Sequence, residues 1–244
     1  MSGRVALVTG GTRGIGRGIA LALARQGWTV AVSYRADARA AAETRAALEG
    51  VGARALALRA DVSDPAAAAA LVREVEAACG RIDALVQAAG PFRRVPLLDE
   101  TPEGWRDTLR GNLDPLLFLT QAVAPGMAAR RWGRILALGL ATADRVGAQP
   151  NVTAYAIAKT GVLVLVRSLA RVLAADGITV NAVSPGVLDA GSAPRAELEA
   201  MQRRIPAGRW GRIEDVVAAA RFLLSEEAGY VTGANVPVSG GWGL

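Results

Sequence analysis

Histidine is absent from the 244 residues of this sequence, and cysteine occurs once, as Cys79. One cysteine excludes a disulfide within the chain, and without histidine most zinc sites and serine triads cannot form. We therefore expect no metal site. Any chemistry should come from tyrosine, lysine, serine, threonine, asparagine or carboxylate side chains.

Long apolar runs are also missing, although 52% of the residues are hydrophobic. The longest purely apolar stretches, such as residues 161–166, fall far short of the roughly 18 residues that cross a bilayer. The first candidate strand begins at Arg4, which leaves no room for the charged and apolar regions of a signal peptide. We expect a cytoplasmic protein with no membrane partner.

Acidic residues are outnumbered, and the net charge of +6 raises nucleic acid as a partner. The arginines are spread from Arg4 to Arg221, however, and aromatic residues do not interleave with them as a platform for single strands requires. We expect no nucleic-acid partner.

Lysine is nearly absent, because Lys159 is the only lysine among the 28 basic residues. Its compact ammonium can lower the pKa of a neighbouring phenol and take part in a proton relay, which a guanidinium cannot do. Tyr155 stands four residues earlier in a helical pattern over 154–172, so both side chains share one helix face. We interpret the pair as a proton-transfer site. The alternative is an exposed pair without function.

A strand, a glycine turn and a helix are present at the start of the chain. Residues 4–9 are aliphatic and β-branched, glycines stand at 10, 14 and 16, and an Ala/Leu-rich helix runs to Gln26. These glycines allow the backbone to turn tightly against a pyrophosphate, and the helix N-terminus favours the anion. In this context the pattern indicates a dinucleotide site.

The second strand ends in Arg35, where an NAD-binding unit usually carries an acid for the ribose hydroxyls. Arg35 and Arg13 could bind a 2′-phosphate through charge-assisted hydrogen bonds, which predicts NADP(H) as the cofactor. The alternative is that both are ordinary surface arginines.

Strands alternate with helices of about 10 to 20 residues along the whole chain. This alternation predicts one α/β domain over residues 1–244, a doubly wound parallel sheet of about seven strands with helices on both faces. Asp61 ends the third strand, where an adenine ring could lie. The expected strands are 4–9, 29–34, 53–60, 84–88, 134–138, 178–183 and 235–238, and the later helices are 37–49, 65 onward, 101–130 in two parts, 154–172 and 214–224.

Short motifs follow the glycine turn (9–16, TGGTRGIG) in a fixed order: Asp61, Ala89-Gly90, Asn112, Tyr155 with Lys159, Pro185-Gly186, Val231-Thr232-Gly233 and Gly240-Gly241. This set resembles the short-chain dehydrogenase/reductase family over essentially the whole chain. Within the family it is most similar to the bacterial 3-oxoacyl-carrier-protein reductase group.

The resemblance implies roles for individual residues. Tyr155 would protonate a carbonyl oxygen, Lys159 would lower the pKa of that phenol and hold the nicotinamide ribose, and Asn112 would anchor a water that links Lys159 to solvent. A homotetramer is also implied. The residues expected to bind NADP(H) are Gly10, Thr12, Arg13, Gly14, Ile15, Gly16, Arg35, Asp61, Val62, Ala89, Gly90, Tyr155, Lys159, Pro185, Gly186 and Val187.

Two positions depart from the family pattern. Gln87 and Ala88 stand where the family has two asparagines. The place of the catalytic serine falls on Leu140 when aligned from the fifth strand, and on Thr142 when counted 13 residues back from Tyr155. Of these two, threonine alone can donate a hydrogen bond, so we hypothesise that Thr142 takes the role of the serine.

We predict an NADPH-dependent reductase of a ketone or a 3-oxoacyl-type carbonyl, acting on a small molecule that is free or carried on an acidic protein. Residues 188–208 are the expected substrate lid, and Arg130, Arg131 and Arg171 are candidates for docking a carrier. The alternatives are a pteridine-type reductase and, because of Leu140, a catalytically weak NADP(H)-binding scaffold.

Overall fold

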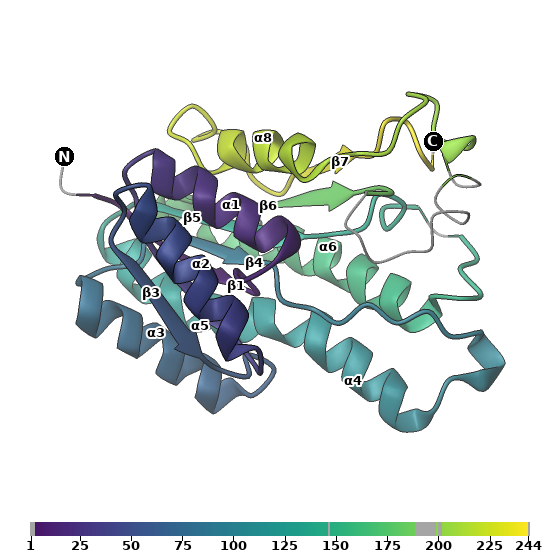
Figure 1. Ribbon diagram of the computed structural model, residues 1–244, viewed down its shortest axis with the longest axis horizontal. Coiled ribbons are helices and arrows are strands. Elements are labelled where there is room, and N and C mark those ends of the chain that lie inside the picture. Colours follow the sequence, from purple (N-terminus) through teal and green to yellow (C-terminus); the bar gives the residue numbers. More distant parts are fainter. Residues whose placement is uncertain (1–2, 146, 189–198, 200–201, 244) are drawn as a thin grey trace.

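The computed structural model describes residues 3–145, 147–188, 199 and 202–243, and one sheet of seven parallel strands lies at its centre (Figure 1). The strand order is β3-β2-β1-β4-β5-β6-β7, which confirms the predicted doubly wound sheet. The strands are β1 (Val5–Thr9), β2 (Thr29–Tyr34), β3 (Ala55–Arg59), β4 (Ala84–Gln87), β5 (Gly133–Leu138), β6 (Ile178–Pro185) and β7 (Asn235–Val238).

Helices bury both faces of the sheet (Figure 1). Successive strand residues point to opposite faces, so Leu7 packs into one apolar cluster and the next residue, Val8, into the other. Burial on both faces explains why the central strands read as continuous aliphatic runs. The first cluster includes α3 (Pro65–Cys79), α5 (Asp114–Ala129) and α6 (Thr153–Leu173), and the second includes α1 (Gly14–Arg25), α2 (Ala38–Gly50) and α8 (Ile213–Leu223).

The helical segment predicted over 101–130 is indeed two helices, α4 (Pro102–Asn112) and α5. Thr101 caps α4 by accepting the N–H of Gly104 at 3.0 Å. The break falls at Leu113 because Pro115 has no N–H to donate, and the N–H of Leu116 bonds to the carbonyl of Leu113 at 3.2 Å.

The chain after β6 is described only in part. β6 continues to Pro185, two residues past its predicted end, and pairs there with Val238 of β7. Leu188 forms an isolated bridge to Gly211. Most of the predicted lid, residues 189–198 and 200–201, lies outside the described residues.

Two kinds of feature are missing from the described part of the chain. None of its helices is both long enough and apolar enough to pass through a bilayer. Its cysteine and carboxylate side chains do not gather in groups of three or more that could hold a metal ion.

Candidate functional site

A cavity of about 780 Å³ lies at the carboxyl ends of the central strands. Strand β1 has β2 on one side and β4 on the other, so the order of the sheet reverses there. Doubly wound sheets bind ligands at such a switch point, because the loops on either side diverge. The residues that line the cavity follow each of the strands from β1 to β6, with Gly111 from α4 and Tyr155 and Lys159 from α6.

The turn after β1 is built around glycine. Gly10 has a φ of +62°, and a Cβ there would lie 2.9 Å from the Cα of Ala89 in the loop after β4. Helix α1 begins at Gly14, its N-cap residue Arg13 makes no side-chain cap, and its first turn holds no acidic residue. The first N–H groups of α1 are therefore available to an anion at the cavity wall.

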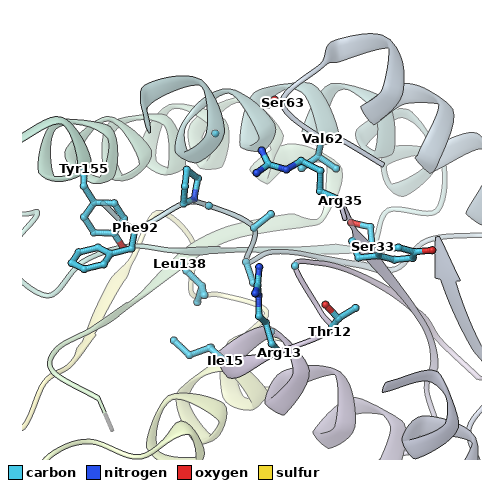
Figure 2. A pocket seen from close by; sticks show the side chains of 18 of the residues that line it. Thr12, Arg13, Ile15, Ser33, Arg35, Val62, Ser63, Phe92, Leu138 and Tyr155 are labelled. Carbon is cyan, nitrogen blue, oxygen red and sulfur yellow. The ribbon is translucent and has the colours of Figure 1, made fainter. Parts of the chain in front are cut away.

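Arg13 and Arg35 line the cavity together with Ser33, at the end away from Tyr155 (Figure 2). Both arginines are exposed, and neither guanidinium forms a hydrogen bond or salt bridge with a described residue. Asp37, two positions after Arg35, accepts the N–H of Ala40 at 2.9 Å and caps α2. The carboxylate of Asp37 is thus already hydrogen-bonded, while the guanidinium groups of Arg13 and Arg35 face the cavity.

Asp61 lines the cavity just beyond β3. Its carboxylate accepts the hydroxyl of Ser63 at 2.7 Å and the N–H of Ser63 at 3.1 Å. The Ser63 hydroxyl is the main cause that lowers the pKa of Asp61, and the charges of Arg35 and Arg110 act in the same direction. Asp61 is therefore an ionised acceptor in a fixed position.

Tyr155 and Lys159 stand one turn apart on α6 and both line the cavity. The Nζ of Lys159 lies 5.5 Å from the centre of the Tyr155 ring and donates to the carbonyl of Leu138 at 2.8 Å. Burial lowers the pKa of Lys159 from 10.5 to about 8. Burial also raises the pKa of Tyr155 from 10.0 to about 12.

That Lys159 lowers the pKa of Tyr155 stays a prediction, because burial alone causes the shift of the phenol here. The phenol loses contact with water, which disfavours its charged form, and the nearby ammonium donates its hydrogen bond to the carbonyl of Leu138. The spacing in the sequence places both side chains on one helix face. It does not reveal which acceptor the ammonium meets.

Phe92 is a part of the site that the sequence analysis does not anticipate. Its ring meets the Tyr155 ring edge to face, with centroids 5.1 Å apart and planes at 88° (Figure 2). No motif marks this residue, since only the fold brings the loop after β4 to α6. Other lining residues missed from the sequence include Ser33, Ser63, Pro91, Gly111 and Leu138.

Asn112 lies behind the cavity wall rather than on it. Its Nδ2 donates to the carbonyls of Pro91 and Thr108, at 2.9 Å each, and its Oδ1 finds no partner among the described residues. A Cβ at Gly90 would collide with that oxygen. Asn112 therefore holds the loop that carries Phe92.

Leu140 lies on the cavity wall, and Thr142 does not belong to the described lining. The hydroxyl of Thr142 accepts from Nε2 of Gln149 at 3.5 Å, and its methyl group faces Gly243. It would have to leave this arrangement to reach a carbonyl at Tyr155. The hypothesis that Thr142 replaces the serine is therefore not supported by its placement.

The structure brings most of the predicted cofactor-binding residues together. Gly14 and Val187 are outside the described lining, and the carbonyl of Val187 accepts the N–H of Gly211 at 3.0 Å. Gln87, which departs from the family pattern, donates to the carbonyl of Ala89 at 2.7 Å and so supports the loop. The predicted residues that line the cavity are Gly10, Thr12, Arg13, Ile15, Gly16, Arg35, Asp61, Val62, Ala89, Gly90, Tyr155, Lys159, Pro185 and Gly186.

The strand order and the cavity at its switch point define the class of protein by its fold, which is the Rossmann type. A family model described as enoyl-(acyl carrier protein) reductase matches residues 10–243. The chain belongs to the short-chain dehydrogenase/reductase family.

Individual relatives match over nearly their full length. The 3-oxoacyl-acyl-carrier-protein reductase of Pseudomonas aeruginosa is 39% identical over 246 residues, which cover 99% of this chain and 98% of the relative. The enzyme of the same name from Staphylococcus aureus (strain Mu50) is 38% identical, with 97% and 96% covered. The crystal structure of a protein described as a short-chain alcohol dehydrogenase from Sinorhizobium meliloti 1021 superposes with a TM-score of 0.92 at 38% identity, with 99% and 97% covered.

Proposed function

We propose that the chain uses NADPH to reduce the carbonyl group of a ketone or a 3-oxoacyl thioester, with Tyr155 as the proton donor. One observation carries the proposal: a single cavity extends from Arg13 and Arg35 to the phenol of Tyr155. The relatives named 3-oxoacyl-acyl-carrier-protein reductase support the substrate class.

The residues of the cavity fit a nicotinamide dinucleotide. The turn at Gly10 has no room for a side chain, and the uncapped start of α1 offers N–H groups to a pyrophosphate. Asp61 would accept hydrogen bonds from the adenine, and Pro185 and Gly186 supply a wall without charge. When bound, the nicotinamide supplies the hydride.

Tyr155 and Lys159 would manage the proton. With a pKa of about 12, the hydroxyl of Tyr155 keeps its proton at neutral pH and can donate it to the more basic alkoxide that forms from a carbonyl. With a pKa of about 8, the Nζ of Lys159 is mostly charged at neutral pH and can stabilise the phenolate that remains. Leu138, Leu140 and Phe92 would keep water away from the reacting carbonyl.

The preference for NADPH over NADH is supported by Arg13 and Arg35. Arginine binds phosphate with two parallel hydrogen bonds, and both guanidinium groups face the end of the cavity beside β2, where the adenosine ribose lies in such folds. Asp37 already caps α2 and is a poor candidate for holding ribose hydroxyls.

Carrier docking at Arg130 and Arg131 stays a prediction. Arg130 donates to the carbonyl of Ile82 at 2.6 Å and lies 3.8 Å from the Asp83 carboxylate, while Arg131 donates to the carbonyl of Ala175 at 3.0 Å. Both come just before β5, so they lie at the amino ends of the strands, whereas the cavity lies at the carboxyl ends.

The experiment is to follow cofactor oxidation with ketones, a 3-oxoacyl thioester and a pteridine. We expect turnover of a ketone or of the thioester with NADPH, and none after Tyr155→Phe. Turnover of the pteridine alone would support the pteridine-type reductase instead. Tight NADPH binding without turnover of any substrate would overturn the proposal in favour of a scaffold.

A further inference from the structure

Phe92 is a large aromatic side chain that remains 65% exposed, although it lies on the cavity wall beside Tyr155. The two rings meet edge to face and form one apolar corner (Figure 2). Apolar surface left in water costs free energy, and that cost is recovered when a ligand covers it. The open surface of Phe92 is thus placed to cover whatever reacts at Tyr155.

Phe92 is held by the residues on either side of it. The carbonyl of Pro91 accepts the Nδ2 of the buried Asn112 at 2.9 Å. Arg93 forms a salt bridge of 3.0 Å to Glu100, whose side chain is 9% exposed. The backbone before and after Phe92 is therefore fixed. The ring stays exposed at the cavity and does not pack against the rest of the protein.

The same loop is also tied to the helix that carries Tyr155. The N–H groups of Val95 and Leu97 donate to the carbonyls of Asn151 and Pro150, at 2.9 and 2.8 Å. Residues 150–151 lead directly into α6. Backbone hydrogen bonds therefore fix the spacing between the Phe92 ring and the Tyr155 phenol. A fixed spacing favours a role for Phe92 in positioning the substrate relative to the phenol.

Few charged side chains of the described residues line the cavity near this corner. Among the described lining residues, Arg13, Arg35, Asp37 and Asp61 follow β1, β2 and β3 and belong to the nucleotide end. Lys159 is buried against the carbonyl of Leu138. A carbonyl held at Tyr155 is consequently flanked by the Phe92 ring and by leucine side chains at 138 and 140.

Building on the proposed function, we propose that Phe92 selects carbonyl substrates that carry an aromatic or conjugated planar group next to the carbonyl, by stacking against that group. Aromatic pairs are stabilised beyond the area that they bury, and a saturated ring of the same size lacks this contribution. Because the two protein rings adjoin, a group stacked on Phe92 leaves its carbonyl beside the phenol. The selection should act on binding more than on hydride transfer.

The test compares acetophenone with cyclohexyl methyl ketone, which share a carbon skeleton and differ in aromaticity. Dissociation constants of both are measured with saturating NADP⁺, so that no reduction occurs, for the parent, Phe92→Leu and the control Leu98→Ala. Leu98 stands on the same loop, is 97% exposed and lies outside the described lining. We expect the parent to prefer acetophenone, and Phe92→Leu to reduce that preference by about 3- to 10-fold. Leu98→Ala should keep it.

Kinetics with NADPH give a second readout, in which Phe92→Leu should change the KM ratio of the two ketones more than the kcat ratio. An unchanged binding preference in Phe92→Leu, an equal loss in Leu98→Ala, or no binding of either ketone to the parent would overturn the inference. If the parent binds the ketones but reduces neither, the proposed function fails, and the binding ratio still decides the role of Phe92.

Discussion

The ammonium of Lys159 donates to the main-chain carbonyl of Leu138 over 2.8 Å, which joins α6 to the carboxyl end of β5. The side chain is buried, and the described surroundings offer it this carbonyl rather than a carboxylate. A buried cation without an anionic partner is stabilised less than in water, so the pKa of Lys159 falls to about 8. Its charge therefore changes within a readily accessible pH range.

This shift predicts a pH-dependent stability. Between about pH 8 and 10.5 the unfolded chain binds the lysine proton more strongly than the folded chain, so the contribution of Lys159 to the free energy of unfolding rises with pH. We expect the difference in unfolding free energy between the parent and Lys159→Met to shift in favour of the parent by on the order of 2 to 3 kcal/mol from pH 7 to 10. Urea denaturation at several pH values measures it.

Tyr155→Phe is the control for this experiment, because the phenol of Tyr155 titrates at a higher pH than Lys159. The raised pKa of Tyr155 adds stability that is fully present below pH 10 and is lost as the pH rises towards 12. Tyr155→Phe should therefore keep the rise between pH 7 and 10. A pH-independent difference between the parent and Lys159→Met would contradict this prediction, because it would show that folded Lys159 keeps an ordinary pKa and stays charged over this range.

Arg35→Asp tests the choice of cofactor. If Arg35 binds the 2′-phosphate, the change should weaken NADPH binding by about 1.5 to 3 kcal/mol more than NADH binding, as for a hydrogen bond to a charged group. The loss should shrink at high salt. Titration of both cofactors into both proteins measures this difference.

Arg39→Asp is the matched control for charge. Arg39 is exposed on α2, pairs with Glu43 at 2.8 Å and lies outside the described lining of the cavity. Arg39→Asp should leave the ratio of NADPH to NADH affinity within about twofold of the parent ratio, because surface ion pairs contribute little. Equal affinity of the parent for the two cofactors would end the argument for Arg35.

The sequence predicts the fold and the glycine turn at one end of the cavity well, because both depend on local patterns. The turn at Gly10 uses backbone rules that act within a few residues, and the structure has this turn where the sequence places it. Strand ends are less accurate, as β6 shows, since pairing with β7 extends it to Pro185.

The catalytic end depends on contacts between distant segments, and there the sequence is a weaker guide. Phe92 meets Tyr155 only because the loops before α4 and before α6 bond to each other. The acceptor of Lys159 comes from β5, 21 residues away. The position of the missing serine could not be chosen by counting, because two counts gave Leu140 and Thr142.

One side of helix α6 is exposed and apolar, which predicts self-association. The family resemblance implies that the assembly is a homotetramer. Ile157, Val164 and Val172 are exposed by 48%, 56% and 71% and share one side of α6, while its other side packs into the core. We expect Val164→Glu to dissociate the assembly, because a charge would be buried between copies. Light scattering at micromolar concentration measures the mass.

Val51→Glu is the control for this change, since Val51 is 39% exposed at the end of α2 and far from α6 in sequence. It should leave the mass unchanged. A parent protein that is already a monomer under these conditions would refute the assembly.

Neither Leu140 nor Thr142 is placed to supply the hydrogen-bond donor that the family resemblance implies beside the carbonyl. Leu140 lies on the cavity wall and Thr142 bonds to Gln149, so we expect that no hydroxyl takes this role. Thr142→Val should then leave the rate of single-turnover hydride transfer within about twofold. Leu140→Ser should raise it, by up to roughly 10², since the loss of such a donor costs 10² to 10³ in other enzymes.

Leu140→Ala separates the hydroxyl from the space that it needs. Both substitutions remove the leucine side chain, which packs against the core, so both should lower thermal stability to a similar extent. A gain shared by the serine and alanine variants would come from room for the substrate, whereas a gain limited to serine would come from the donor. A fall of about 10² or more in Thr142→Val would instead show that Thr142 leaves Gln149 and reaches the carbonyl during the reaction.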